Sequence, residues 1–550
     1  MPGTGESIQR RLRRRAEQLR DDASSSPGAP FRGVPTRRTL LTGAVASGAG
    51  LALAGPLAGP AAASPRAPQG SGGDRGGPRV VVVGAGLAGL TCAYRLRQQG
   101  VTAQVFEARP DRLGGRCWTA RGFEQGQVAE HGGEFIDTRH VHIRRIAREL
   151  GLTLEDREAA TGGGSVSPLW LRGRLRDEEA VYAGFDDVVR RLTREYRRIG
   201  SYRAATATRA AREFDEMSAA DWLRDNVDDV LLRDALTIGQ SGFFGIDTNR
   251  MSAINLLEAY VAPYPGADER YHVHGGNDRI PYGMARTLGR GAIRRDAPLL
   301  ALRRRGNGSY ALRFGGVRGE VHADYVVLSL PFTALRDVDL AHAGLSARRL
   351  RAIHRLGMGT NAKNHVQLRV RPKRLGDWSG DMTMDAPHPQ SSWESTAGQT
   401  GSTSVVTIWR GGRSGAGYPT DVAHRWAPER IVRGNLAAFE RGVPGVTAAF
   451  NGLSWLDSWV DDPWVRGSYA GFLRAVHPVL GLPEAAGGPG PLRRRAHVHP
   501  LAGLPQRWRR ERRPRGTRDP GRRRGAVPVS PRPGRSAAGP GRDPGTRRTG

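Results

Sequence analysis

Three glycines and one acidic residue near the start of the chain have the spacing of a nucleotide-binding site. Gly84, Gly86 and Gly89 form the pattern G-x-G-x-x-G, and Glu107 follows in the next segment. In this pattern one glycine permits a tight turn, one lets the backbone approach a pyrophosphate, and one lets a helix pack on a strand. A carboxylate at Glu107 can accept hydrogen bonds from ribose hydroxyls. Because glycine-rich turns often serve packing only, the surrounding elements decide the interpretation.

The elements around these residues come in the required order. Residues 79–83 are a β-branched run without alternation, which is typical of a central parallel strand buried on both faces. A helical stretch follows the glycines as far as Gly100, and its N-terminus offers free N–H groups to phosphates. A second strand over residues 103–106 ends at Glu107. Strand, turn, helix and acid together predict a dinucleotide-binding domain.

Two further glycine pairs separate FAD from other dinucleotides. One lies in Arg112-Leu113-Gly114-Gly115-Arg116, and the other in Glu130-His131-Gly132-Gly133-Glu134. With these motifs the chain resembles the FAD-dependent amine oxidase family, which includes monoamine, polyamine and L-amino-acid oxidases. Paired glycines permit close backbone approach and arginine offers forked donors to phosphate, whereas the alternative is a β-turn with a surface arginine. The resemblance implies non-covalently bound FAD with contacts from Arg112, Gly114, Gly115, Arg116, Gly132 and Gly133.

The resemblance extends through about residues 79–473. Residues 275–281 resemble the family's turn back into the FAD domain, and residues 325–331 indicate another buried strand of the FAD sheet. Leu299 falls where the family places an apolar residue against the adenine, although a plain core residue fits equally well. Residues 464–469 resemble the last motif before the family's C-terminal flavin segment.

The predicted fold class is α/β, with a Rossmann-like FAD-binding domain interleaved with a mixed α+β substrate domain. Helical, charged stretches and a strand-rich stretch between the FAD motifs are assigned to the substrate domain. The predicted boundaries are a signal and disordered leader at 1–78, the FAD-binding domain at 79–139, 261–345 and 456–473, the substrate domain at 140–260 (mostly helical) and 346–455, and a disordered tail at 474–550.

Lys363 is the candidate catalytic residue. The chain has 84 lysines and arginines, of which only Lys363 and Lys373 are lysines, and Lys363 begins an expected strand. The resemblance places here the lysine that holds a water against flavin N5. The alternative is a solvated lysine on an edge strand. His365 is expected to have a packing role, and the sequence shows no convincing metal-ligating cluster.

The chemistry that the resemblance implies comes mainly from the flavin. A neutral primary or secondary amine gives a hydride to flavin N5 and becomes an imine, which water hydrolyses to an aldehyde or keto acid and ammonia, while O2 is reduced to hydrogen peroxide. A dry, aromatic pocket favours the neutral amine by desolvation, so no dedicated base is needed. The alternatives are an L-amino-acid oxidase, another flavin oxidoreductase of the desaturase or porphyrinogen oxidase type, and an inactive truncated relic.

Asp137 is the candidate substrate-binding residue. It follows the second glycine pair, near where some polyamine oxidases carry an acid that could meet a second ammonium group. Amino-acid oxidases of the family commonly place an arginine in this region to hold the substrate carboxylate. The sequence therefore favours an amine without a carboxylate, and the alternative is a solvated or capping aspartate.

The N-terminus is typical of an export signal. Arg37 and Arg38 precede a mildly apolar stretch that ends in small residues at 61–64. This resembles a twin-arginine signal with a cleavage site, which implies the twin-arginine machinery as a partner and an extracellular or cell-envelope location. Prolines and glycines within the apolar stretch count against a stable membrane anchor.

The last part of the chain departs from the family pattern. Residues 474–550 are a mixture of Pro, Gly and Arg that carries +15 of the net charge of +31. Read one base later, one legal choice of codons for residues 492–509 spells FAGEHTSTHSQGYLNGG, which resembles the segment that the family has here. We therefore hypothesise a one-base frameshift near residues 473–474, which explains the charge without a nucleic-acid partner. A basic RNA-binding tail is the alternative.

Overall fold

The structure, a computed structural model, describes residues 8–25, 77–160, 165–200, 207–261, 268–385, 390–418 and 422–475. The expected twin-arginine motif and its cleavage region at 61–64 lie outside the described residues, as does the expected tail from residue 476 onwards. All described residues belong to the first of the two units of the chain, Met1–Val498.

The expected dinucleotide-binding strand lies inside a four-stranded parallel sheet. The strand order is β13, β1, β2 and β9, and each neighbouring pair is parallel. All four residues of β1 are buried, in agreement with a β-branched run without alternation. The predicted Rossmann-like α/β arrangement is therefore confirmed, with the bounds β1 (Val80–Val83), α3 (Leu87–Gln98), β2 (Ala103–Phe106), β9 (Ile293–Arg294) and β13 (Tyr325–Leu328).

The strand β13 is less buried than the sequence predicts. It lies at one edge of the parallel sheet and pairs with β1. Tyr325 is 38% exposed, and the other three residues of the strand are half-buried. Because an edge strand has one open side, the expectation of a buried strand is wrong here.

Antiparallel strands and short helices complete this part of the fold. Strands β10, β11 and β12 form a three-stranded antiparallel sheet, and their apolar side chains share a core with those of β1 and β2. Helix α12 packs against α3. The bounds are β3 (Thr119–Ala120), β4 (Ala129–Glu130), β8 (Tyr271–Val273), α12 (Arg279–Leu288), β10 (Leu299–Arg304), β11 (Tyr310–Phe314), β12 (Glu320–Ala323) and α13 (Phe332–Leu335).

An eight-stranded sheet positions Lys363. Strand β15 (Ala362–Leu368) pairs with β18 on one side and β20 on the other, and all seven of its residues are buried. The alternative of a solvated edge-strand lysine is therefore wrong. The sheet has the order β19, β20, β15, β18, β17, β16, β6 and β7. The remaining strands are β6 (Leu169–Leu171), β7 (Arg174–Arg176), β16 (Met382–Met384), β17 (Ser391–Glu394), β18 (Ser404–Arg410), β19 (His424–Trp426) and β20 (Phe450–Ser458).

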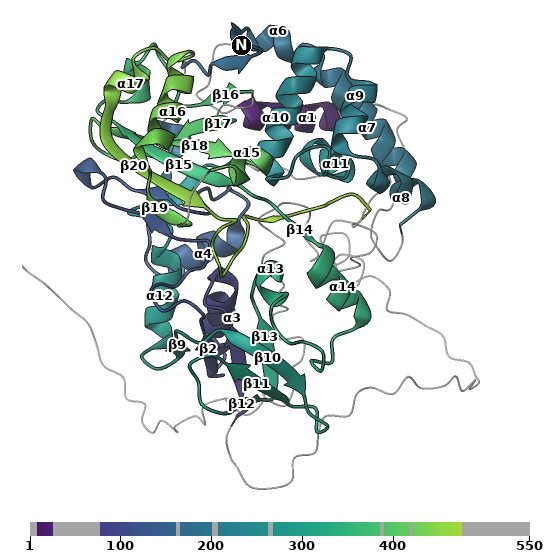
Figure 1. The fold of residues 1–550 in the computed structure, drawn as a ribbon, viewed down its shortest axis with the longest axis vertical. Coiled ribbons are helices and arrows are strands. Elements are labelled where there is room, and N and C mark those ends of the chain that lie inside the picture. The colour runs from purple at the N-terminus through teal and green to yellow at the C-terminus, as the bar shows by residue number, and fades with distance from the viewer. Residues whose placement is uncertain are drawn as a thin grey trace, which may run out of the picture. The chain divides into compact units, whose positions relative to one another are not determined.

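Helices dominate the chain between β5 (Leu154–Asp156) and β8, and others flank the strands of the eight-stranded sheet in the sequence (Figure 1). A large hydrophobic core joins the first group of helices, with Phe185, Phe214 and Trp222 among its buried members. The bounds are α4 (Val141–Glu149), α5 (Arg157–Ala160), α6 (Glu178–Tyr182), α7 (Phe185–Ile199), α8 (Arg209–Glu216), α9 (Ala219–Asn226), α10 (Val230–Phe244), α11 (Ile254–Tyr260), α14 (Ala347–Arg355), α15 (Gly412–Ala416), α16 (Glu429–Glu440) and α17 (Val446–Ala449).

The first described residues form a helix that the sequence analysis does not predict. Helix α1 (Ile8–Ser25), purple in Figure 1, packs against α7 and α11. Leu12 is 6% exposed and Ala16 is 1% exposed, and both belong to the same core as α7 and α11. The prediction of a disordered leader is therefore wrong for residues 8–25, because an apolar stripe between the arginines packs on the folded protein.

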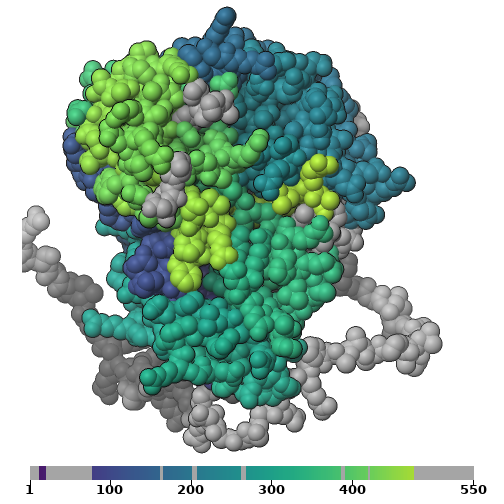
Figure 2. All heavy atoms as spheres, in the orientation of Figure 1, coloured from purple at the N-terminus to yellow at the C-terminus, as the bar shows by residue number. Residues whose placement is uncertain are grey.

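The last described residues lie against the same helices. The carbonyl oxygen of Phe472 accepts hydrogen bonds from the backbone N–H of Ser252 at 3.0 Å and from the side chain of Asn255 at 2.9 Å. Figure 2 shows the segment that ends the described chain, in yellow-green, at the surface of the molecule. Among the helices that the structure describes, none is both long and apolar enough to cross a membrane.

Candidate active site

The three glycine segments that the sequence singles out meet in the structure. Gly86 and Gly114 form a parallel β-bridge, in which the N–H of Gly114 donates to the carbonyl of Ala85 at 2.9 Å. The N–H of Gly133 donates to the carbonyl of Arg116 at 2.9 Å. The turn after β1, the turn after β2 and the segment after β4 therefore form one continuous backbone surface.

Close packing explains the last glycine of the first motif. A Cβ atom at Gly89 would lie 2.0 Å from the carbonyl oxygen of Gly84 and 2.5 Å from Oγ of Ser329. Gly84 itself has a φ of 99°, a conformation that favours glycine. Helix α3 can therefore begin close to the end of β1 only with glycine at these positions.

Glu107 lies at the end of β2, where the sequence places it, and it contacts the glycine turn. Its carboxylate accepts a hydrogen bond from the N–H of Ala85 at 2.6 Å and another from the N–H of Arg109 at 2.9 Å. Glu107 is 9% exposed. The carboxylate therefore orders the turn as well as lying where a ribose is expected.

Arg112 carries a buried positive charge with unused hydrogen-bond donors. It is 4% exposed and donates from Nη1 to the carbonyl of Gly115 at 2.6 Å. Nη2 lies 3.9 Å from Oδ2 of Asp462, and neither Nε nor Nη2 makes a hydrogen bond to the described residues. Burial lowers the pKa of Arg112 to about 10. Its guanidinium also lies 4.2 Å from the ring centroid of Trp118. A buried guanidinium with free donors beside glycine turns fits a pyrophosphate, so these residues suit the expected FAD.

Arg116, Leu299 and Asp137 lie in different surroundings. Arg116 donates to the carbonyl of Ser468 at 2.5 Å. Leu299 belongs to the hydrophobic core below the parallel sheet, as its packing alternative predicts. Asp137 is 3% exposed, accepts from the N–H of Glu269 at 2.9 Å and lies 3.1 Å from Nε2 of His140, so it is not a solvated aspartate. Burial and the nearby acids raise the pKa of Asp137 to about 7.

Lys363 forms a buried ion pair. Its Nζ lies 2.9 Å from Oε2 of Glu134 and donates to the carbonyl of Glu130 at 2.8 Å. Lys363 is 2% exposed and Glu134 is 6% exposed. Burial alone would raise the pKa of Glu134, but the positive charges of Lys363 and Arg157 hold it at about 2. The pair is therefore a lysine and an ionised glutamate.

Tryptophans surround this ion pair. The Nζ of Lys363 lies 5.4 Å from the ring centroid of Trp393 and 5.9 Å from that of Trp409. The indole N–H of Trp393 donates to Oε1 of Glu134 at 2.9 Å, so Glu134 contacts both Lys363 and Trp393. Tyr469 lies beyond Trp409, at 6.4 Å between ring centroids. The surroundings of Lys363 are thus aromatic, and such surroundings favour a neutral amine over an ammonium ion.

A cluster of imidazoles surrounds Asp457 of β20, the strand that pairs with β15. Both oxygens of Asp457 accept from Nδ1 of His131, at 2.9 and 3.0 Å, and Nδ1 of His424 lies 2.7 Å from Oδ1. Nε2 of His365 lies 3.4 Å from Oδ2. Burial lowers the pKa of His131 to about 4, whereas hydrogen bonds to Asp457 and Asp462 outweigh burial and raise the pKa of His424.

The grouping of His131, His365 and Asp457 is of a kind that could hold a metal ion. No such cluster could be expected from the sequence, because these residues lie on three different strands or strand ends and share no local spacing. In the structure His131 is hydrogen-bonded to Asp457, and Nε2 of His365 lies 3.4 Å from the same carboxylate. Sequence reasoning also missed Glu134, Trp393 and Trp409 as site residues. Only the position of Glu134 beside the second glycine pair is a signal that could have found one of them.

Comparisons with known proteins show which family the chain resembles. The family model described as flavin containing amine oxidoreductase matches residues 87–504, so the match runs past residue 473, where the sequence analysis ends the resemblance. Putrescine oxidase of Kocuria rosea is 31% identical over 275 residues, which are 46% of this chain and 56% of that protein. The flavin-dependent L-tryptophan oxidase RebO of Lentzea aerocolonigenes is 27% identical over 303 residues, 51% of this chain and 63% of that protein. The chain thus spans less than two thirds of the length of these curated relatives.

A solved structure gives the same fold. Cyclohexylamine oxidase from Brevibacterium oxydans superposes with a TM-score of 0.64 at 18% identity, over 74% of this chain and 90% of that chain. At this identity the likeness concerns the fold. The family match, by contrast, covers more than half of the sequence and includes Gly89, the two later glycine pairs and Lys363. The chain therefore belongs to the flavin-containing amine oxidoreductase family.

Proposed function

We propose that this protein is an FAD-dependent oxidase of primary or secondary amines that lack a carboxylate. The observation that carries the proposal is the buried Lys363–Glu134 ion pair, which lies beside Trp393 and Trp409. Glu134 directly follows the second glycine pair, one of the segments that suit the cofactor. A bound flavin supplies the hydride acceptor and transfers the electrons to O2, giving hydrogen peroxide. An imine leaves the site and is hydrolysed to a carbonyl compound and ammonia.

The protein's own residues prepare the amine and the lysine. Lys363 is buried and lies beside Trp393 and Trp409, so an amine that enters this aromatic site is favoured in the neutral form that can react. Glu134 holds the lysine side chain in one orientation through Oε2, and Trp393 fixes Glu134 through Oε1. Lys363 is then ready to hold a water molecule with its remaining N–H.

The cofactor is proposed to bind without a covalent bond. Arg112 and the amides of the turn after β1 would hold its pyrophosphate, and Glu107 would accept from its ribose. Both cysteines, Cys92 and Cys117, are buried. Acid precipitation of the protein should release all of the flavin into the supernatant; flavin that stays with the pellet would contradict this part of the proposal.

The cations near the ion pair favour amines over amino acids. Lys363 pairs with Glu134, and Arg157 donates to the carbonyls of Glu269 at 3.4 Å and Glu394 at 3.0 Å. A substrate carboxylate would have to compete with these acceptors. An L-amino-acid oxidase is the second candidate, supported by the likeness to an L-tryptophan oxidase.

A peroxide-coupled assay with matched substrates tests the proposal. Tryptamine and L-tryptophan differ only by the carboxylate, and putrescine and cyclohexylamine extend the amine series. We expect peroxide from at least one amine and none from tryptophan, both with the 550-residue chain and with the downstream reading frame restored. Turnover of tryptophan alone would favour the second candidate, and no turnover in either series would overturn the enzyme assignment.

Export and the frameshift are further parts of the proposal. We propose that the arginine pair at 37–38 directs the folded protein to the twin-arginine machinery, and that residues 474–550 are read in a shifted frame. Replacing both arginines by lysine should keep the protein inside the cell. Resequencing the gene around codons 473–474 tests the second point, since codons incompatible with the text FAGEHTSTHSQGYLNGG would contradict it.

A further inference from the structure

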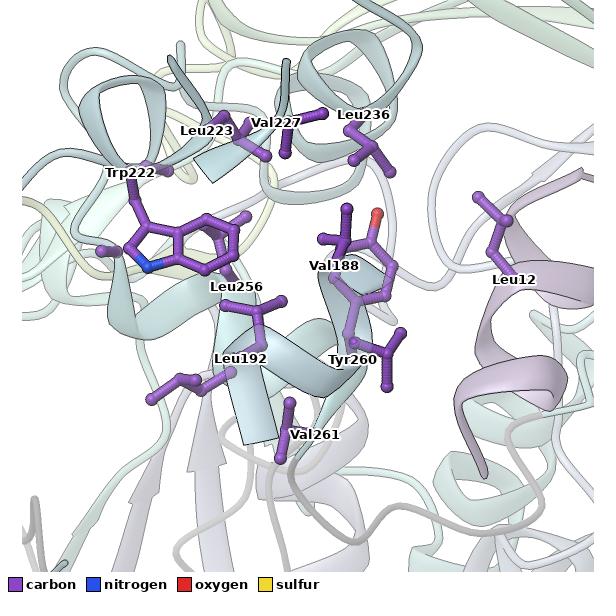
Figure 3. Packing of buried hydrophobic residues seen from close by; sticks show 14 of the residues in the cluster. Leu12, Val188, Leu192, Trp222, Leu223, Val227, Leu236, Leu256, Tyr260 and Val261 are labelled. Atoms are coloured by element: carbon purple, nitrogen blue, oxygen red, sulfur yellow. The ribbon is translucent and has the colours of Figure 1, made fainter. Parts of the chain in front are cut away.

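Helix α1 lies outside the residues that the family model matches and takes no part in the proposed chemistry. Its apolar residues Leu12, Ala16 and Leu19 recur at intervals of three and four positions, which is one face of a helix. Leu12 and Ala16 are buried in the core of the helical region, and Leu19 packs against that core. Figure 3 shows Leu12 directed at the cluster that contains Tyr260 and Val188.

Two ion pairs flank this apolar face. Arg11 pairs with Glu178 in the first turn of α6, and Arg15 pairs with Asp186 in the first turn of α7, through Nε at 3.0 Å and Nη2 at 2.6 Å. Arg11 and Arg15 are one helical turn apart, so both face the same two helix ends. Apolar contacts and charges therefore agree on one docked orientation of α1.

A third arginine connects α1 to the neighbourhood of Lys363. The guanidinium of Arg13 lies 4.0 Å from the ring centroid of Phe243, near the end of α10. The residue before it, Gly242, accepts the indole N–H of Trp409 at 2.9 Å. Trp409 is one of the two tryptophans beside Lys363. The docked helix thus contacts the segment that holds one wall of the candidate active site.

We propose that residues 8–25 form a docking helix in cis, which braces the substrate domain and the α10 segment as long as the leader is attached. The helix precedes both the arginine pair at 37–38 and the small residues at 61–64. Cleavage at that site, which rests on the proposed export, would separate α1 from the enzyme. One short helix binds weakly once it is no longer linked, because linkage supplies its high effective concentration.

Limited trypsin digestion of the full chain tests the docking without any need for export or activity. Leu12→Asp places a charge in the core, whereas Gln18→Asp introduces the same residue at an exposed position of the same helix. We expect Leu12→Asp to raise the rate of cleavage after Arg13 at least tenfold and to lower the thermal midpoint by a few degrees, with Gln18→Asp like the wild type. Equal cleavage rates in the two variants would overturn the proposal.

A charge reversal tests the orientation. Arg11→Glu should speed cleavage, and the double variant Arg11→Glu with Glu178→Arg should restore protection. Protection should also be independent of protein concentration, since docking between two copies would instead strengthen with concentration and would contradict docking in cis. A double variant that is no better protected than Arg11→Glu would contradict the pairing.

A specific protease site inserted at residues 61–64 tests the release. After the folded chain is cut, we expect the leader fragment to separate from the enzyme on size exclusion, with a lower thermal midpoint for the remaining enzyme. A fragment that stays bound at micromolar concentration, or an unchanged midpoint, would overturn the idea that attachment maintains the brace. If export fails in cells but these results hold, only the export proposal fails.

Discussion

Two regions of the molecule are built in opposite ways: the cofactor cradle, by which we mean the glycine turns at 84–89 and 112–116 together with Glu107, and the surroundings of Lys363. In the cradle, Glu107 contacts Ala85 and Gly86 pairs with Gly114, so the contacts join residues that are close in the sequence, and a strand and a helix of fixed geometry hold them. Around Lys363, the partners Glu134, Trp393 and Trp409 come from three strands or strand ends far apart in the chain. Local spacing therefore specifies the first region, and long-range packing of the eight-stranded sheet specifies the second.

The two regions also differ in what they tolerate. The cradle depends on the absence of side chains, because a Cβ at Gly89 would overlap a backbone carbonyl. The Lys363 region depends on a balance of charge, because each member of the ion pair is buried only together with the other. Substitutions should therefore fail for steric reasons in one region and for electrostatic reasons in the other.

The largest effect is expected in the cradle. Gly89→Ala would place a methyl group 2.0 Å from the carbonyl oxygen of Gly84, which the rigid end of β1 has no room to accept. We expect loss of flavin binding and of the folded FAD-binding domain, measured by the bound-flavin absorbance and by circular dichroism. Gly434→Ala is the matched control, since this helical glycine has open space around its Cβ position. A Gly89→Ala protein that binds flavin like Gly434→Ala would contradict the steric role.

The next effect concerns the charge balance of the second region. Lys363→Met leaves the buried Glu134 carboxylate without its cation, and removal of one partner of a buried pair costs about 3–5 kcal/mol. We expect a loss of this size in the free energy of unfolding, measured by urea denaturation, and the loss of oxidase activity. Adding Glu134→Gln should recover much of the stability but none of the activity. Simple addition of the two losses in stability would contradict the coupling.

The dependence of the unfolding free energy on pH, at acid pH, tests the same ion pair. In the folded protein the pKa of Glu134 is about 2, below its usual value near 4.3, so the ionised group stabilises the fold above about pH 4.3. This stabilisation, about 3 kcal/mol, is lost as the pH falls from 4.3 towards 2. Glu134→Gln should therefore flatten the dependence of unfolding free energy on pH in this window. An unchanged slope would show that the pair is not ionised.

The smallest effect is expected at Asp137. The pKa of Asp137 is raised to about 7, so this group favours the folded state below its unfolded pKa near 3.9, and that contribution is lost as the pH rises through 7. Asp137→Asn keeps an acceptor for the N–H of Glu269 but weakens the contact of the carboxylate with Nε2 of His140, at 3.1 Å, which offsets much of the gain from removing the buried charge. The net rise in stability at pH 8 should therefore be small, about 1 kcal/mol. A large rise in KM for putrescine with no change in stability would instead favour substrate binding.

The contrast between the regions explains what the sequence could reveal. The order of strand, glycine turn, helix and acid predicts the Rossmann-like part correctly, since each step is local. Lys363 could be selected because lysine is rare here and because the resemblance places a lysine at this position, but its burial follows from the position of β15 inside a sheet that no local pattern describes. Glu134 could not be paired with Lys363, because the contact joins residues that only the tertiary fold brings together.

For helix α1, the sequence-based prediction failed for a different reason. Its apolar positions have helical spacing, but Leu12 lies among five arginines at 10–15, which reads as a solvated, charged leader. Two of the arginines that make this apolar stripe hard to recognise, Arg11 and Arg15, themselves form ion pairs that hold the helix in place. A stripe this narrow predicts a docked helix only when the apolar core and the acidic residues that contact it are known.

The scarcity of lysine has a practical consequence. Lys363 is buried in its ion pair, whereas Lys373 is exposed, so outside the amino terminus an acylating reagent meets a single reactive side-chain amine. Surface attachment through that amine would orient every molecule alike on an electrode or bead. Because Lys363 is buried in its pair with Glu134, Lys373 is left as the single side-chain amine for immobilising the enzyme.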